Sequence, residues 1–454
     1  MRYWRHTVFA LLVAWCASQP AFGQIETEAQ TDDLTLEDCL TQVLTRNPEI
    51  QESRLDVERA AGTKLVYRSR ALPQLSADVN VGLRYGALFP PSGPYGIATA
   101  EFSQPLLDVG IPPTLHRGRL EVIIAQQNLN RIVTDRLHEA RLTFLQALFL
   151  RDLVALHEEI DQRLRANVQS EQQRLDVGTG NQAAVKSAKI QELNLELDLA
   201  NLRGSYFSTV TKIAELCGRD PTEATNGTRQ LRLPKPVGPL RYEPVNVDWL
   251  EESAYAVQHR ADVKLLEALV DATGADRQTV QAQYYPLVTL VASGLFIPQS
   301  LLISKQTSIV AGQDPRSSQV EAGVEMSWQI IDNGRVTGAS RQIEATRQAY
   351  KIALRQLEQN IPRELAAIEG ALQNADARRD ALVKSAEEAE ENLRLIERRV
   401  SLGEATQFDF LQAQSNLLSV RAGIVDAIHS HEVARAELDH ATGRYLQYHS
   451  EKAP

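Results

Sequence analysis

Residues able to catalyse a reaction or to bind a metal are scattered along this 454-residue chain. Its nine histidines include no HExxH or similar pair of metal ligands, and the sequence has no Walker loop, nucleophile elbow or paired-cysteine motif. His429 and His431 stand two residues apart in a helical stretch and point in different directions, so we interpret both as surface residues. The sequence therefore predicts no enzyme activity, no metal site and no cofactor.

The three cysteines form no disulfide framework. Cys16 follows the bulky Trp15, whereas the attachment site of a lipoprotein requires a small residue there, so we do not expect a lipid anchor. Cys39 and Cys217 lie far apart in the sequence. Two thiols in a chain of this length are typical of separate buried cysteines.

The N-terminus has the pattern of an export signal. Arg2 and Arg5 precede an apolar run from Thr7 to Ala17, and a small-x-small pattern ends at Gly23. The alternative is a membrane anchor, but the run is much shorter than the roughly 20 residues that a spanning helix needs. We therefore expect a signal peptide over residues 1–23.

Removal of the signal peptide takes away two arginines, leaving 46 basic against 58 acidic residues and a net charge of −12. This balance argues against nucleic acid as a partner. No later stretch approaches 18 consecutive apolar residues, so no transmembrane helix is predicted. Entry into a membrane would then require a closed β-barrel.

The same short segments recur in the same order in both halves of the chain, first 213 and later 224 or 225 residues apart. The matched pairs are 47–50 with 260–263, 72–75 with 285–288, 107–110 with 331–334, 177–178 with 402–403, and 217–218 with 442–443. This duplication predicts one repeat over 34–219 and another over 247–448, joined by a Pro- and Gly-rich linker over 220–246.

Each repeat is predicted to contain a helix, two strands, a very long helix, a tight turn and a return helix. Alternation of apolar and polar residues places the strands at about 72–84, 96–107, 286–297 and 319–331. One face of these strands is apolar, and the charged residues on the other face are Asp78, Arg84, Glu321 and Glu325.

The long helices carry the clearest signal. From Arg119 to Val177 there are 59 residues without Gly or Pro, which would form a rod of roughly 90 Å. Charged residues along it exclude a membrane span, so a coiled-coil rod is expected. The second rod, from about Ala339 to Leu402, contains Pro362 and Gly370 and is predicted to bend there. The fold class is thus mainly α with a β contribution.

Four strands per chain are too few to close a barrel, because known single-chain membrane barrels begin at about eight strands. Unpaired sheet edges are not viable in hydrocarbon. Three copies would supply 12 strands, with apolar side chains toward lipid and the charged face toward a wet lumen.

The duplicated plan, from about Leu34 to Tyr448, resembles the TolC family of outer-membrane efflux proteins. The most telling local matches are the segments 174–178 and 399–406, which look like that family's paired periplasmic hairpin tips. The resemblance implies a homotrimer, with a shared 12-stranded barrel in the outer membrane of a Gram-negative bacterium and a long helical barrel in the periplasm. It also implies a passive exit duct for drug efflux or type I secretion, working with a periplasmic adaptor (membrane fusion) protein and an inner-membrane transporter. The residues it places at the adaptor-docking tips are Val177, Gly178, Thr179, Leu402, Gly403 and Glu404.

The same resemblance places the channel constriction at Asp409, six residues after Gly403. Three copies of Asp409 around a threefold axis would form a carboxylate ring that favours cations. Gln412 replaces a second acid found in some family members, so Phe408 and Phe410 are expected to help hold the gate shut. In the alternative interpretation, Asp409 only complements the helix dipole at the start of a helix.

A soluble periplasmic coiled-coil scaffold or adaptor without a pore is the main alternative function. It accounts for the export signal and the long helices. It does not account for amphipathic strand pairs at matching places in both repeats. Drug efflux and protein secretion are not separated by the sequence.

Overall fold

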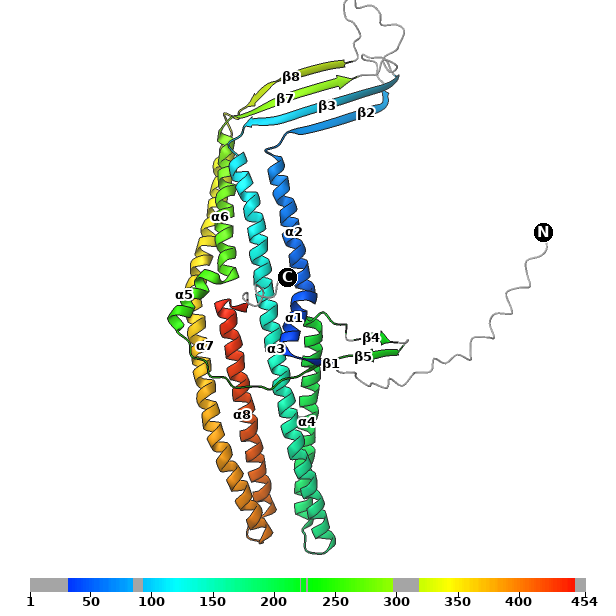
Figure 1. Ribbon diagram of the computed structural model, residues 1–454, viewed down its shortest axis with the longest axis vertical. Helices are drawn as coiled ribbons and strands as arrows, with labels where there is room; N and C mark the ends of the chain where they lie inside the picture. The colour runs from blue at the N-terminus through cyan, green and yellow to red at the C-terminus, as the bar shows by residue number, and fades with distance from the viewer. Residues whose placement is uncertain (1–31, 85–92, 221, 226–227, 297–317, 446–454) are drawn as a thin grey trace, which may run out of the picture.

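The computed structural model describes residues 32–84, 93–220, 222–225, 228–296 and 318–445. The predicted signal peptide lies outside these residues. Figure 1 shows an elongated chain, with a sheet at one end, two helical hairpins at the other end, and long helices running side by side between them. Within the described ranges, the search for a helix long and apolar enough to span a membrane finds none.

Four long helices form the hairpins. Apolar residues recur along them at steps of three and four, as in Val133, Leu137, Ala140, Phe144 and Leu148, all of which are buried. Pro362 lies inside the second long helix, which continues through it as one element. The helices are α3 (Ile111–Asp176), α4 (Gln182–Leu216), α7 (Arg335–Ser401) and α8 (Gln407–Thr442).

Shorter helices cover the upper half of each rod. Asn47 begins one of them, because its side chain accepts hydrogen bonds from the amides of Glu49 and Ile50 at 3.0 and 3.3 Å. In the second repeat Arg260 occupies the equivalent position. These elements are α1 (Leu36–Arg46), α2 (Pro48–Ser69), α5 (Trp249–His259), α6 (Ala261–Gln281) and the short 3-10 helix η1 (Ala282–Tyr284).

Four antiparallel strands form the sheet at the upper end, in the order β2-β3-β7-β8. The contact between β3 and β7 joins the two repeats, and β2 and β8 are the outer strands. The strands are β2 (Gln74–Arg84), β3 (Gly93–Leu107), β7 (Leu287–Phe296) and β8 (Ser318–Ser327). Residue 297, the last of the expected third strand, lies outside the described residues.

The last strand is shorter than its alternating sequence suggests. Alternation continues to Ile330, but β8 ends at Ser327. Beyond it, the indole of Trp328 donates to the carbonyl of Tyr284 at 3.1 Å, and the Asp332 carboxylate accepts from the amide of Val336 at 2.9 Å. Residues 328–331 therefore form the turn into α7, and the prediction of a strand to residue 331 is wrong.

The segment between the repeats contains structure that its Pro and Gly content concealed. Its three strands have three or four residues each, too few for an alternating pattern to be recognised. One of them pairs in parallel with the start of the described chain. They are β4 (Thr222–Thr225), β5 (Thr228–Leu231) and β6 (Pro234–Pro236), and the partner of β6 is β1 (Asp32–Leu34).

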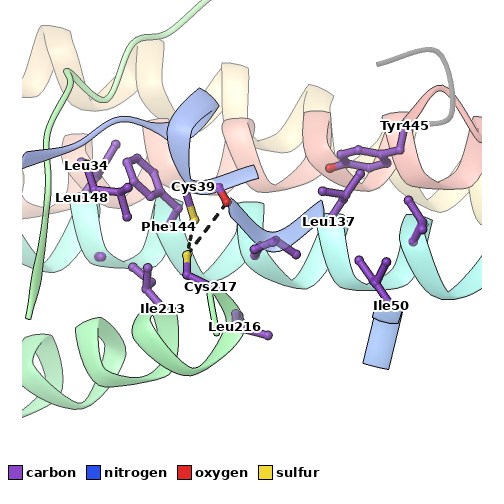
Figure 2. Packing of buried hydrophobic residues seen from close by; sticks show 14 of the residues in the cluster. Leu34, Cys39, Ile50, Leu137, Phe144, Leu148, Ile213, Leu216, Cys217 and Tyr445 are labelled. Carbon is purple, nitrogen blue, oxygen red and sulfur yellow. Dashed lines mark hydrogen bonds between the residues drawn. The ribbon is translucent and has the colours of Figure 1, made fainter. Parts of the chain in front are cut away.

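Each repeat has its own buried apolar cluster. In the first repeat α1, α3 and the end of α4 pack around Phe144 and Ile213. Figure 2 shows this cluster, with Cys39 and Cys217 inside it. In the second repeat α7 contributes Ile361, Leu365 and Ile368. The sheet and the hairpin tips are thus held apart on a rigid helical shaft.

Candidate functional site

The turn from α3 to α4 forms the first hairpin tip. Gly178 takes the left-handed conformation with φ +79°. Its amide donates to the carbonyl of Leu175 at 3.0 Å, and the amide of Thr179 donates to that of Arg174 at 2.9 Å. These two bonds satisfy the last carbonyls of α3 in a Schellman motif, which requires a residue without Cβ strain at position 178.

The turn from α7 to α8 repeats this geometry 225 residues later. Gly403 also has φ +79°, and its amide donates to the carbonyl of Val400 at 3.1 Å. The amide of Glu404 donates to the carbonyl of Arg399 at 2.8 Å. Both tips lie at the same end of the molecule, farthest from the sheet (Figure 1).

The tips present apolar side chains to solvent. Val177 is 76% exposed and Leu402 is 72% exposed, at matching positions in the two repeats. A Cβ added to Gly178 or Gly403 would meet no atom within 4 Å, so the surface beside each glycine is open. The six tip residues thus form two similar, accessible turns, which is a geometry suited to receiving a partner.

Asp409 lies at the start of α8. Its carboxylate accepts from the amide of Thr406 at 2.8 Å and from the Thr406 hydroxyl at 2.7 Å. The Thr406 hydroxyl in turn accepts from the amide of Asp409, which completes a capping box. The hydroxyl of Thr406 lowers the pKa of Asp409 below its ordinary 3.8, so the carboxylate is held ionised as well as in a fixed position.

The other three residues expected at the constriction divide into two groups. Phe408 is 64% exposed and Gln412 is exposed, and their spacing of four residues puts them on the same side of α8. Phe410 is half-buried and packs against Leu393 and Leu417. Phe408 and Gln412 are thus accessible, whereas Phe410 belongs to the packing between α7 and α8.

Polar contacts between the two hairpins lie above the tips and were not anticipated. The amide of Gln407 donates to the side-chain oxygen of Asn167 at 2.5 Å, across 240 residues of sequence. Arg421 on α8 contacts Glu390 on α7 at 2.6 Å and Glu159 on α3 at 3.5 Å. No local sequence pattern indicates such contacts, because they depend on how two separate hairpins pack.

The strand register brings most of the predicted polar residues to one face of the sheet. Asp78 pairs with Thr99, and through β7 this row continues to β8, where Glu321 and Glu325 have the same facing. Glu101 shares this face, although the weaker alternation of β3 gave no reason to name it. Arg84 is the last residue of β2, in register with Gly93.

The opposite face is apolar across the outer strands. Its side chains are highly exposed in the single chain, among them Leu75 at 75%, Val81 at 74% and Val320 at 82%. A monomer in water does not leave so many neighbouring apolar side chains uncovered. The sheet therefore has one polar face and one face suited to an apolar environment.

The interpretation of His429 and His431 as surface residues is wrong. His431 is 1% exposed, and its ring nitrogens lie 2.7 Å from the Asp376 carboxylate and 2.9 Å from the backbone carbonyl of Glu243. His429 is partly buried and stacks on Phe149, with ring centroids 4.6 Å apart. Both rings are covered because α8 packs against α7 and α3 on different sides. Among the described residues, no three or more His, Cys, Asp or Glu side chains are grouped to hold a metal ion.

The fold matches solved outer-membrane channels. The channel VceC of Vibrio cholerae aligns with a TM-score of 0.73 at 18% identity, over 90% of this chain and 96% of that one. The open MtrE channel of Neisseria gonorrhoeae aligns with a TM-score of 0.70 at 16% identity, over 90% and 88%. At these identities the likeness establishes the fold, which is that of TolC-like outer-membrane channels.

The sequence itself matches the family of outer membrane efflux proteins over residues 39–219 and 254–444. The outer membrane efflux protein BepC of Brucella suis is 23% identical over 449 residues, covering 97% of this chain and 92% of that protein. The chain belongs to the outer membrane efflux protein family, as the TolC resemblance predicted, and is an outer-membrane efflux channel protein. This is a family of transport channels rather than enzymes, and nothing supports the alternative of a scaffold without a pore.

Proposed function

We propose that three copies of this chain form one exit duct. The observation that carries this proposal is the sheet of four strands, in which β2 and β8 are outer strands without a partner on one side within the described chain. Unpaired edges and an exposed apolar face are both satisfied when β8 of one copy pairs with β2 of the next. Three sheets then close into a barrel of 12 strands in the outer membrane.

The polar face of the sheet lines the lumen of this barrel. Asp78, Glu321 and Glu325 share that face with Glu101, and Arg84 is assigned to the same lining. The apolar face contacts lipid. The duct continues through the helical shaft into the periplasm, so substrates pass from the periplasm to the outside without chemical change.

The hairpin tips dock a periplasmic adaptor protein, which couples the duct to an inner-membrane transporter. Val177, Gly178 and Thr179 form one docking turn, and Leu402, Gly403 and Glu404 form the other. Two observations support this assignment: the turns are alike in backbone geometry, and their apolar residues are exposed. A partner that recognises one tip can recognise the other by the same contacts.

The constriction lies near the start of α8. Three Asp409 carboxylates, each held in its capping box, form a ring that attracts cations at the narrow end of the duct. Phe408 and Gln412 border this ring, and Phe410 supports it from the helix packing. The Gln407–Asn167 and Arg421–Glu159 contacts hold the second hairpin against the first in the closed state.

The trimer and its barrel are tested together by mass and by a pair of substitutions. The purified protein should have trimeric mass in mild detergent and dissociate in sodium dodecyl sulfate, whereas a monomeric mass in mild detergent would contradict the proposal. Val324→Lys puts a charge on the apolar face, at a cost of about 2–4 kcal/mol near the bilayer midplane, and should abolish outer-membrane assembly.

Glu325→Lys is the matched control, because it places the same side chain on the next residue but on the polar face. It should assemble normally and change only the ion selectivity of the channel. Equal assembly of the Val324→Lys and Glu325→Lys variants would show that the apolar face does not contact lipid.

A further inference from the structure

Two cysteines distant in sequence lie together in the core of the first repeat. The sulfur atoms of Cys39 on α1 and Cys217 at the end of α4 are 3.6 Å apart, although 178 residues separate them. Figure 2 shows the two side chains pointing toward each other among Phe144, Ile213 and Leu216. Both cysteines are 0% exposed. The expectation of two unrelated buried cysteines is therefore wrong in its essential point.

The contact belongs to a joint that both repeats build. In the first repeat, the side-chain amide of Asn47 donates to the carbonyl of Leu216 at 3.0 Å, where α4 ends. In the second repeat, Arg260 donates to the carbonyl of Ala441 at 3.1 Å, where α8 ends. The first pair of residues lies 213 apart and the second pair 225 apart, which are the spacings of the duplication. Each repeat thus ties the end of its return helix to the segment that begins its second helix.

A second contact in this joint is also duplicated. Arg219 donates to Gln42 at 2.6 Å in the first repeat. The equivalent Arg444 lies over the ring of Tyr255 at 4.9 Å in the second repeat and forms an ion pair with Glu252. The backbone contact is the same in both repeats, but the side chains that reinforce it differ.

The position of Cys39 is the one at which the two joints diverge in chemistry. Its counterpart 213 residues later is Glu252, which reinforces the second joint through its ion pair with Arg444. The counterpart of Cys217 is Thr442, whose hydroxyl donates to the carbonyl of Leu438 at 2.8 Å. The first repeat has no ion pair at this place, and its two thiols occupy the space instead.

We propose that Cys39 and Cys217 are joined by a disulfide in the exported protein, as the covalent counterpart of the ion pair in the second joint. Closing the bond from 3.6 Å to about 2.05 Å requires the sulfurs to approach by about 1.5 Å, which small rotations of the two side chains can supply. The bond ties α1 to the end of α4 and closes a loop that contains α2, β2, β3 and α3.

The compartment supplies the oxidant. An outer-membrane protein crosses the periplasm, where protein disulfide oxidants keep thiols oxidised. One cysteine thiolate attacks the oxidant's disulfide and forms a mixed disulfide, and the second thiolate displaces the oxidant as a dithiol. The two cysteines lose two protons and two electrons, and the oxidant takes up both electrons.

Oxidation takes place before the core closes. In the folded chain neither sulfur is accessible, and the contact with Cys217 together with burial raises the pKa of the Cys39 thiol, which slows its reaction. The reaction therefore occurs while α1 and α4 are still exposed in the exported chain, and the finished bond is then protected from reductants.

Peptide mapping tests the proposal directly. The protein is taken from outer membranes, denatured in the presence of a thiol-alkylating reagent without reductant, and digested with trypsin. The expected product is the peptide 213–219 linked to the peptide that ends at Arg46, and it should disappear on reduction. The denatured, unreduced chain should also migrate faster in a gel than the reduced chain, because of its closed loop.

Matched variants define the outcomes. Cys39→Ser and Cys217→Ser should each abolish the linked peptide and the mobility difference, and each should leave the remaining cysteine open to alkylation. A version without residues 1–23, kept in a reducing compartment, should have both thiols alkylated. Complete alkylation of Cys39 and Cys217 in the exported protein would overturn the proposal, and so would attachment of either cysteine to any other thiol.

Discussion

The tip glycines allow bulk and backbone strain to be tested separately. Gly178 and Gly403 both have φ +79°, where a residue with a Cβ is strained by about 1–2 kcal/mol. A Cβ at either position meets no atom within 4 Å, so no steric clash inside the chain adds to this strain. Alanine therefore introduces strain with little bulk. Asparagine introduces bulk with less strain, because it tolerates the left-handed conformation.

Three substitutions at each tip follow from this geometry. Gly178→Ala should leave export close to the parental rate, because strain of about 1–2 kcal/mol at an exposed turn does not unfold a long helical hairpin. Gly178→Asn and Gly178→Val should both reduce export. An added side chain at a closely packed contact costs about 1–3 kcal/mol, which corresponds to adaptor binding roughly 5- to 150-fold weaker. The same order is expected at Gly403.

The assay compares export of a fluorescent substrate with binding of the purified adaptor to each variant. Trimer yield is measured in parallel, and Gly204→Asn in α4 is the control for added bulk away from the tip, since Gly204 also has open space beside it. Parental export by both the Asn and Val variants would refute docking at these turns. A loss in the Ala variant as large as in the Asn variant would assign the effect to the shape of the turn instead.

Two further predictions concern α8. Asp409→Asn and Asp409→Ala should weaken cation preference and block by multivalent cations to the same extent in planar-bilayer recording, because both remove the charge while only Ala also loses the hydrogen bond to the helix start; unchanged selectivity in both variants would leave Asp409 as a helix cap. The pKa of this carboxyl is lowered by the hydroxyl that bonds it, so the charged form persists to lower pH, and cation preference should survive below pH 3.8 and fade only as the pH falls through the lowered pKa. His431→Leu removes two hydrogen bonds from a side chain that is 1% exposed and should destabilise the packing of the linker on α8 by about 2–4 kcal/mol. Amide hydrogen exchange around Glu243 measures this effect, and protection equal to that of the parental chain would contradict it.

The sequence by itself determined the elements whose signal is local. The spacing of apolar residues by three and four predicted the long helices, and alternation predicted strands with one apolar and one polar face. The glycines at 178 and 403, at equivalent positions of the two repeats, predicted the tips. Each of these features depends on residues that are neighbours within a turn or two of the chain, so a single sequence contains the information.

Tertiary structure decided the features that depend on how the rods pack. The 3.6 Å approach of Cys39 and Cys217 brings together residues 178 apart, and no periodic pattern connects them. The burial of His431 arises because α7 and the linker cover two sides of α8. The position of Phe410 in the packing, away from the exposed Phe408, also depends on which side of α8 meets α7. Local periodicity specifies which residues share a helix face, but the neighbour of that face is chosen by packing between segments that lie far apart in the chain.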